Sequence, residues 1–378
     1  MDGQGPDFHW PTYWPSATKL RGLHPQFTKS VCDHMIDEIL AVLPIVEESK
    51  ISNIRAMRIP ALVAFMVPHS TSYERLTILC KWFTCLQLFD NLFDDPWFSD
   101  EKLPRLEKGL DSLPNDLRHL ATQGQLTDGT AYPEYVHYVR GVLAEMFRLS
   151  PRKDQLLRAA DYLERAIAAA HSRDGSSKMS DDLEQWKQCR VDRTGMFLLF
   201  HWMEFALDLH IPDEVWEDPT MQVLMDEACL QIGVVNDLYS ISKEIFSNDC
   251  RVDSRSVNCV AWLMRGTGES LQEAVDRCWD YAHHLEDSVV HAAIVVKSRF
   301  RQNKAISQVV DAIVYSLQGP WAYQMSTAQH CLKFLRVSQP VPTPEGLKPA
   351  TLDGSKLPFV VLGGDRLLSD WLIASAAI

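Results

Sequence analysis

The sequence predicts an all-α protein, because helical spacing of apolar residues fills most of its 378 positions and period-2 strand patterns are scarce. Apolar residues make up 46% of the chain and charged residues 23%, which is ample for one large core. Helix start signals agree with this fold class. Thr71 with Glu74 and Ser270 with Glu273 fit capping boxes, and Ser150-Pro151 places proline at a first helical position.

The expected helices follow one another with short connectors. A mixed stretch at 103–130 predicts a short helix and a loop, and 173–180 is a polar connector. In chain order, helical spacing predicts helices at Phe27–Glu48, Ile51–Val67, Ser72–Asp94, Pro133–Leu149, Pro151–His171, Asp182–Asp208, Asp213–Phe246, Ser254–Arg265, Leu271–Arg301 and Lys304–Arg336.

The pattern indicates one helical domain with two flanking segments. We expect an N-terminal segment at 1–19, the domain at 20–336, and a proline-rich tail at 337–378 that either packs on the domain or is partly disordered.

Composition excludes several classes of function. The formal net charge of −13 argues against general nucleic-acid binding. The longest apolar run, at 59–68, is too short for a membrane span. Nine cysteines without CxxC pairs, and no secretory signal, predict reduced thiols and a cytoplasmic protein.

A polar row in the predicted helix 213–246 suggests a metal site. Asn236, Ser240 and Glu244 are spaced i, i+4 and i+8, so they share one face and offer the hard oxygen ligands that suit Mg²⁺. Lys243 projects near the same row and can meet a bound anion. Most polar helix rows are simply solvated faces, but the apolar run at 228–235 predicts that this helix is buried. We therefore expect a metal-bound phosphate or diphosphate here.

A second acidic cluster ends another predicted helix. Asp90 and Asp94 share a face, Asn91 lies beside it, and Pro96 ends the helix. Carboxylates at a helix C-terminus are unfavourable unless cations bind between them. The alternative is an acidic helix end that faces solvent.

Arg190 lies between the two clusters in sequence, 46 positions before Asn236. A buried diphosphate pocket needs a bidentate donor of this kind, although a lone Arg is more often a surface residue. Thr194-Gly195 is expected to weaken or break the helix just after Arg190.

Together these residues resemble the class I terpene synthases of the microbial single-domain type, over roughly 20–335. The DNxxD segment Asp90–Asp94 is similar to the family's aspartate-rich motif, and 236–244 matches its NDxxSxxxE motif with Lys before Glu. Arg190 stands at the position of its diphosphate-sensing arginine, and Asn258-Cys259-Val260 matches its Asn-x-Val segment. The resemblance implies an α-helical bundle around a central active-site cavity.

One segment departs from the family pattern. Where the family has an Arg-Tyr pair that binds diphosphate, this chain has Gln329-His330. Their neutral hydrogen bonds are weaker than charge-assisted ones. Either activity is lowered, or Arg193 or an arginine near 251–255 compensates, or the alignment is shifted and Lys333 or Arg336 takes the role.

The resemblance implies Mg²⁺-dependent ionisation and cyclisation of a linear prenyl diphosphate, most simply C15 farnesyl diphosphate, with C10 and C20 open. Asp90, Asp94 and Asn91 would hold two Mg²⁺ ions and the 236–244 row a third, while Arg190 and Lys243 bind diphosphate. The resemblance also implies that Thr194-Gly195 offers a backbone carbonyl to the cation. The full set of substrate-contacting residues that it implies is Phe83, Gln87, Thr194, Gly195, Trp321, Tyr323, Gln329 and His330.

Two alternative functions remain open from sequence. A prenyl chain-elongating transferase would carry a second aspartate-rich motif where Asn236 stands, so the NDxxSxxxE form argues against it. A non-catalytic or weakened relative is supported by Gln329-His330 alone and opposed by the intact metal motifs. A homodimer is possible, as for many soluble proteins.

Overall fold

The structure is all-α. The computed structural model describes residues 24, 26–43, 45, 47–94, 103–128, 132–171, 182–247, 257–320 and 323; for 90–94, 170–171 and 242–247 it describes the backbone alone. The helices are α1 Lys29–Val42, α2 Glu48–Met57, α3 Ile59–Met66, α4 Tyr73–Asp94, α5 Leu103–Asp111, α6 Leu113–Gln123, α7 Glu134–Leu149, α8 Lys153–His171, α9 Leu183–Thr194, α10 Met196–Leu207, α11 Asp213–Trp216, α12 Pro219–Ser247, α13 Cys259–Thr267, α14 Leu271–Arg299 and α15 Lys304–Ser316.

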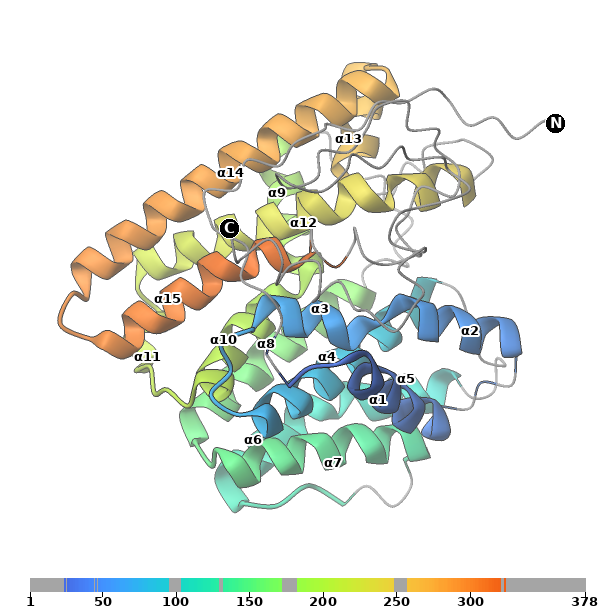
Figure 1. Cartoon of the computed structure of the whole chain (residues 1–378), viewed down its shortest axis with the longest axis vertical. Helices are drawn as coiled ribbons and strands as arrows, with labels where there is room; N and C mark the ends of the chain where they lie inside the picture. Colours follow the sequence, from blue (N-terminus) through green and yellow to red (C-terminus); the bar gives the residue numbers. More distant parts are fainter. Residues whose placement is uncertain are drawn as a thin grey trace.

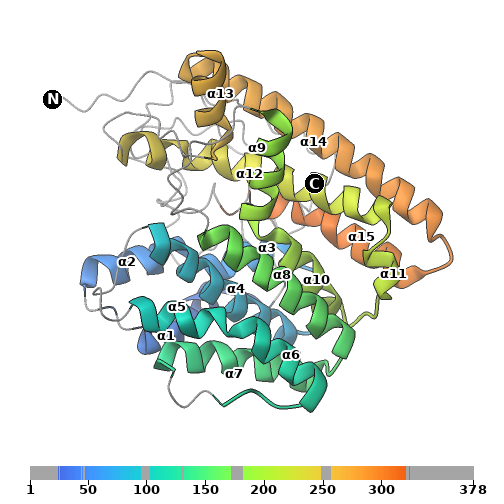
Figure 2. The same cartoon turned by 180° about the vertical axis from the view of Figure 1, so that it is seen from behind.

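The helices form one bundle with two sides. The long helices α12 and α14 run side by side on one side, with α9 and α13 next to them, while α1 to α7 make up the other side (Figure 1). The reverse view shows the same division (Figure 2). Helix α10 packs against both α4 and α12, and its residues from Phe197 to Ala206 are all buried. The two helices that carry the predicted ligand motifs therefore share a central, apolar neighbour.

Several predicted helices are divided where the backbone turns. Arg58 adopts a left-handed conformation with φ 48°, which separates α2 from α3, and Pro60 then lies in the first turn of α3. The single helix expected at 51–67 was therefore wrong. Gly195 has φ 68° and separates α9 from α10, which confirms the break expected at Thr194-Gly195.

Of the three helix start signals predicted from sequence, the structure confirms one and corrects two. The capping box of Ser270 and Glu273 is present at the start of α14. At α4, however, the Ser72 hydroxyl accepts from the Arg75 N–H at 3.1 Å, so Ser72 rather than Thr71 is the cap. Helix α8 begins at Lys153, which leaves Pro151 outside it.

Other differences concern helix ends. The expected helix 27–48 is shortened to α1, and the stretch at 103–130 contains two helices, α5 and α6, instead of one. The expected helix 213–246 is divided into α11 and α12 before Pro219. None of the described helices is long and apolar enough to cross a membrane.

Candidate functional site

The predicted ligand row lies on α12 next to the buried centre of the bundle. Asn236 is partly exposed, Ser240 is buried, and the run from Ala228 to Val235 is buried throughout. Glu244 and Lys243 continue the same helix, and their backbones alone are described. Asn236 is thus the one partly open position in the stretch 228–241 of α12, which is otherwise buried as the apolar run predicted.

Arg190 reaches this helix from α9. Its Nε donates to Asp237 Oδ2 at 2.9 Å and its Nη2 donates to Asp237 Oδ1 at 2.8 Å, so the ion pair is bidentate. Nη2 also donates to the Gly233 carbonyl at 2.9 Å, and Nη1 lies 3.2 Å from Thr194 Oγ1. Both partners are almost fully buried, with side chains 7% and 3% exposed. The pair fixes the guanidinium beside the ligand row.

Gly233 makes this close approach possible. It precedes Asn236 by three residues and Ser240 by seven, so it lies on the same face of α12. A Cβ at this position would lie 2.9 Å from Thr194 Oγ1 and 3.2 Å from the Arg190 Cζ. Any larger residue would push the guanidinium away from the helix.

A third helix, α13, is tied to the same turn of α12. Asn258 is its N-cap, and the Asn258 Nδ2 donates to the Asp237 carbonyl at 2.9 Å and to Ser240 Oγ at 3.3 Å. The Cys259 N–H donates to Asp237 Oδ2 at 2.9 Å. The negative carboxylate of Asp237 thus lies at a helix N-terminus, where the helix dipole stabilises it. Asp237 thereby joins α9, α12 and α13.

Aromatic residues reinforce this junction. Trp186 of α9 donates from Nε1 to the Val257 carbonyl at 2.9 Å and stacks on Trp262 of α13 with ring centroids 5.2 Å apart. The segment that presents Asn258 is therefore held by α9 as well as by α12.

Thr194 and Gly195 lie where the sequence placed them, at the break after Arg190. The Thr194 hydroxyl donates to the Arg190 carbonyl at 2.7 Å, and Gly195 turns the chain into α10. The role expected for them, a carbonyl directed at a cation, stays a prediction.

The acidic motif lies at the end of α4. Asp90, Asn91 and Asp94 are within this helix, and their side chains lie outside the described set. On the same face, Phe83 is buried at 8% exposure and Gln87 is partly buried. Their role as cavity wall stays a prediction.

The candidates near the C-terminal end fall mostly outside the described residues. Trp321, Gln329 and His330 lie outside the described residues, so their roles stay predictions. Tyr323 is described: its hydroxyl donates to the Met57 carbonyl at 2.5 Å, and burial raises its pKa. This hydroxyl is thus engaged with the end of α2.

The described part of the ligand set fits Mg²⁺. Among the described side chains, no three His, Cys, Asp or Glu residues gather closely enough to hold a metal ion. The α12 row, however, relies on amide and hydroxyl oxygens, and Asn236 and Ser240 share one helix face beside the buried Arg190. A magnesium ion keeps several waters, so two such ligands and one carboxylate suffice.

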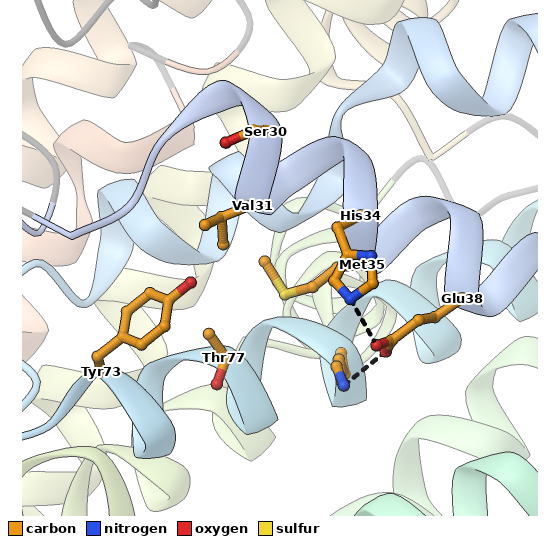
Figure 3. Close-up of a pocket in the computed structure, with 8 residues that line it drawn as sticks. Ser30, Val31, His34, Met35, Glu38, Tyr73 and Thr77 are labelled. Carbon is orange, nitrogen blue, oxygen red and sulfur yellow. Dashed lines mark ion pairs between the residues drawn. The ribbon is translucent and has the colours of Figure 1, made fainter.

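One surface pocket lies elsewhere, between α1 and α4 (Figure 3). Its volume is about 370 Å³, and Glu38 in its lining contacts His34 at 3.1 Å and Lys81 at 2.6 Å. Lys81 precedes Asp90 by nine residues, which is about two and a half turns of an α-helix. The two side chains therefore leave α4 on opposite faces, and the pocket lies on the face away from the acidic motif. It is not part of the predicted metal site.

Comparisons with known proteins identify the family and the fold. A family model described as "Terpene synthase family 2, C-terminal metal binding" matches residues 81–288. This range includes the C-terminal part of α4 with the acidic motif, Arg190, the α12 row and Asn258.

Relatives and solved structures carry related names. The chain is 25% identical over 248 residues to "Sesquiterpene synthase Agr3" of Cyclocybe aegerita, which covers 59% of this chain and 61% of that one. It is 22% identical to a 7-epi-alpha-eudesmol synthase of Streptomyces viridochromogenes, over 73% of this chain and 80% of that one. The crystal structure of a-eudesmol synthase superposes with a TM-score of 0.65 at 16% identity, over 84% of this chain and 99% of that one, which shows a shared fold. Because the family model spans more than half of the residues, the chain belongs to the class I terpene synthases.

Proposed function

We propose that this protein is a lyase that ionises and cyclises a linear prenyl diphosphate with Mg²⁺ and releases inorganic diphosphate. The observation that carries the proposal is the α12 turn, where Asn236 and Ser240 lie beside an arginine that Asp237 holds in place. An oxygen-ligand row next to a fixed buried guanidinium suits a metal-bound diphosphate better than it suits a neutral ligand.

Two groups of residues would hold the metal. Asn236, Ser240 and Glu244 would take one ion, and the α4 residues Asp90, Asn91 and Asp94 two more. Bound Mg²⁺ would supply Lewis acidity to the leaving diphosphate.

The chain's own residues would orient and shield the substrate. Arg190 and Lys243 would bind diphosphate oxygens, and the Asp237 ion pair would keep the Arg190 guanidinium from reorienting. Apolar walls such as Phe83 would exclude water from the carbocation, and aromatic faces would stabilise its charge.

We propose farnesyl diphosphate as the substrate. The Cyclocybe aegerita relative is named as a sesquiterpene synthase, and the Streptomyces viridochromogenes relative is named for cyclising (2E,6E)-farnesyl diphosphate. The aligned region spans less than two thirds of the Cyclocybe relative, so substrate and activity rest on this proposal.

The test is incubation of purified protein with C10, C15 and C20 prenyl diphosphates and Mg²⁺. We expect a cyclic product from the C15 substrate by gas chromatography with mass spectrometry, and matching release of inorganic diphosphate. Asn236→Ala should abolish both, whereas Val223→Ala, at an exposed position near the other end of α12, should change neither. Wild-type turnover in Asn236→Ala would show that the metal assignment is wrong.

A further inference from the structure

We propose that Asn258 is a positioning residue that fixes the Ser240 hydroxyl as an acceptor for Mg²⁺. The inference rests on the proposed function, because it assumes that the α12 row binds the metal. The geometry that carries it is a single buried amide, 1% exposed, between the start of α13 and the ligand turn of α12.

The orientation of the Asn258 amide is set by its neighbours. Its Oδ1 accepts from the backbone N–H groups of Val260 at 3.0 Å and Ala261 at 3.3 Å. Its Nδ2 donates to the Asp237 carbonyl at 2.9 Å. A flipped amide would place NH₂ against two donors and oxygen against an acceptor, so Nδ2 must face α12.

This orientation determines the state of the Ser240 oxygen. A serine hydroxyl has one hydrogen and two lone pairs, and it rotates to suit its surroundings. Because Asn258 Nδ2 donates to Ser240 Oγ at 3.3 Å, one lone pair is occupied and the hydrogen must point elsewhere. A serine within a helix commonly directs that hydrogen to the carbonyl four residues earlier, here Asn236. The second lone pair is then held in one direction.

The same contacts keep the amide itself from moving. The cap bonds fix Asn258 to α13, and the Cys259 N–H donates to Asp237 Oδ2 at 2.9 Å. Asp237 in turn pairs with Arg190. The start of α13, the ligand turn and the arginine therefore form one unit, and Asn258 is its direct contact with a proposed ligand oxygen.

The test compares Asn258→Ser, Ser240→Ala and the double variant with wild type. Serine caps a helix about as well as asparagine, so N258S keeps the α13 cap while its short side chain cannot reach Ser240. The readout is calorimetric binding of inorganic diphosphate across a Mg²⁺ titration, with no prenyl substrate present. Unfolding by urea and circular dichroism check that each variant is folded, and Asn258→Thr repeats the test with a second capping residue.

We expect N258S to need ~10–100-fold more Mg²⁺ for half-maximal diphosphate binding, as for loss of residues that orient metal ligands. In the Ser240→Ala background the same substitution should change nothing further, because the hydroxyl it positions is gone.

Two results would overturn the inference: N258S binding like wild type, or N258S weakening binding equally with and without the Ser240 hydroxyl. If Ser240→Ala itself binds Mg²⁺ and diphosphate like wild type, the proposed metal site is at fault. The two failures are thus distinguishable.

Discussion

Two buried arginine–carboxylate pairs lie near opposite ends of α10, and they differ in what surrounds them. Arg190 and Asp237 meet beside the break at Gly195 that precedes α10. Arg158 and Glu204 meet at the other end, where Nη2 lies 2.8 Å from Oε2. Each carboxylate is at most 3% exposed. Both pairs join several helices, yet we assign a ligand site to the first alone.

The Arg158–Glu204 pair is surrounded by hydrogen-bond donors and aromatic rings that pack the helices together. Glu204 Oε1 also accepts from the Ile211 N–H at 2.8 Å and the Trp216 Nε1 at 3.0 Å. Next to it, the His201 ring lies between Tyr162 and Trp216, with centroids 4.2 Å from each. These contacts tie α8, α10 and α11 together, and the two other carboxylates that the structure describes at Arg158, those of Asp154 and Asp213, form ion pairs with the arginine itself.

The difference teaches that a buried ion pair does not by itself mark an active site. Ion pairs of this kind also serve structure, and removing one partner is costly wherever they lie. What distinguishes Arg190 is the adjacent face of α12, where Gly233 makes room for the guanidinium and Asn236 and Ser240 present oxygens.

The largest effect should come from Asp237→Ala. It leaves the Arg190 guanidinium buried without its carboxylate, so we expect the free energy of unfolding to fall by ~3–5 kcal/mol. Binding of inorganic diphosphate with Mg²⁺ should also weaken, since the guanidinium is no longer held. Urea unfolding and calorimetry measure the two effects, and an unchanged diphosphate affinity in folded protein would contradict the assignment of this pair to the site.

Glu204→Ala should separate stability from binding. Loss of Glu204 leaves the Trp216 Nε1 and the Ile211 N–H without their acceptor, at about 1–3 kcal/mol for each buried group. Arg158 keeps a contact with Asp213, which limits the cost. Diphosphate affinity of the folded variant should equal that of wild type. A matching loss of affinity would show that the two ends of α10 are coupled.

Sequence reasoning recovered the elements that local signals encode. Helical spacing predicted the long helices, glycine predicted the break after Thr194, and Ser270 with Glu273 predicted a cap. It missed the division at Arg58, for which Pro60 was the available signal.

The partners in the candidate site were not predicted, because they depend on contacts between helices. Asp237 is part of the recognised motif, but its pairing with Arg190 joins residues 47 positions apart. Asn258 was noted as part of a segment without a role, and Gly233 was read as one more apolar position. Neither role follows from periodicity, since each depends on the neighbouring helix. Domain limits, homodimer formation and cytoplasmic location stay predictions.

His201→Phe tests the surroundings of the Arg158–Glu204 pair through the pH dependence of stability. Burial holds the pKa of His201 well below its usual value, with Arg158 acting in the same direction. In the described residues neither ring nitrogen has a hydrogen-bond partner. The unfolded chain alone takes up this proton below about pH 6.5, so stability is lost as pH falls, by about 1.4 kcal/mol per unit. Phenylalanine should remove this part of the slope when the free energy of unfolding in urea is measured between about pH 5 and 8, and an unchanged slope would contradict the prediction.

Gly233→Ala should have the smallest effect on stability and should still weaken diphosphate binding. It therefore tests whether the position of Arg190 against α12 distinguishes its ion pair from the Arg158–Glu204 pair. Alanine favours a helix over glycine by up to about 1 kcal/mol, and this offsets part of the crowding against Arg190 and Thr194. We expect a change in the free energy of unfolding within ~1 kcal/mol, but weaker binding of inorganic diphosphate, because the added methyl displaces the guanidinium. Gly141→Ala in α7 is the matched control: a Cβ there meets nothing within 4 Å, so stability should rise slightly and binding should not change. If Gly233→Ala binds diphosphate like wild type, the position of Arg190 against α12 is not what the site requires.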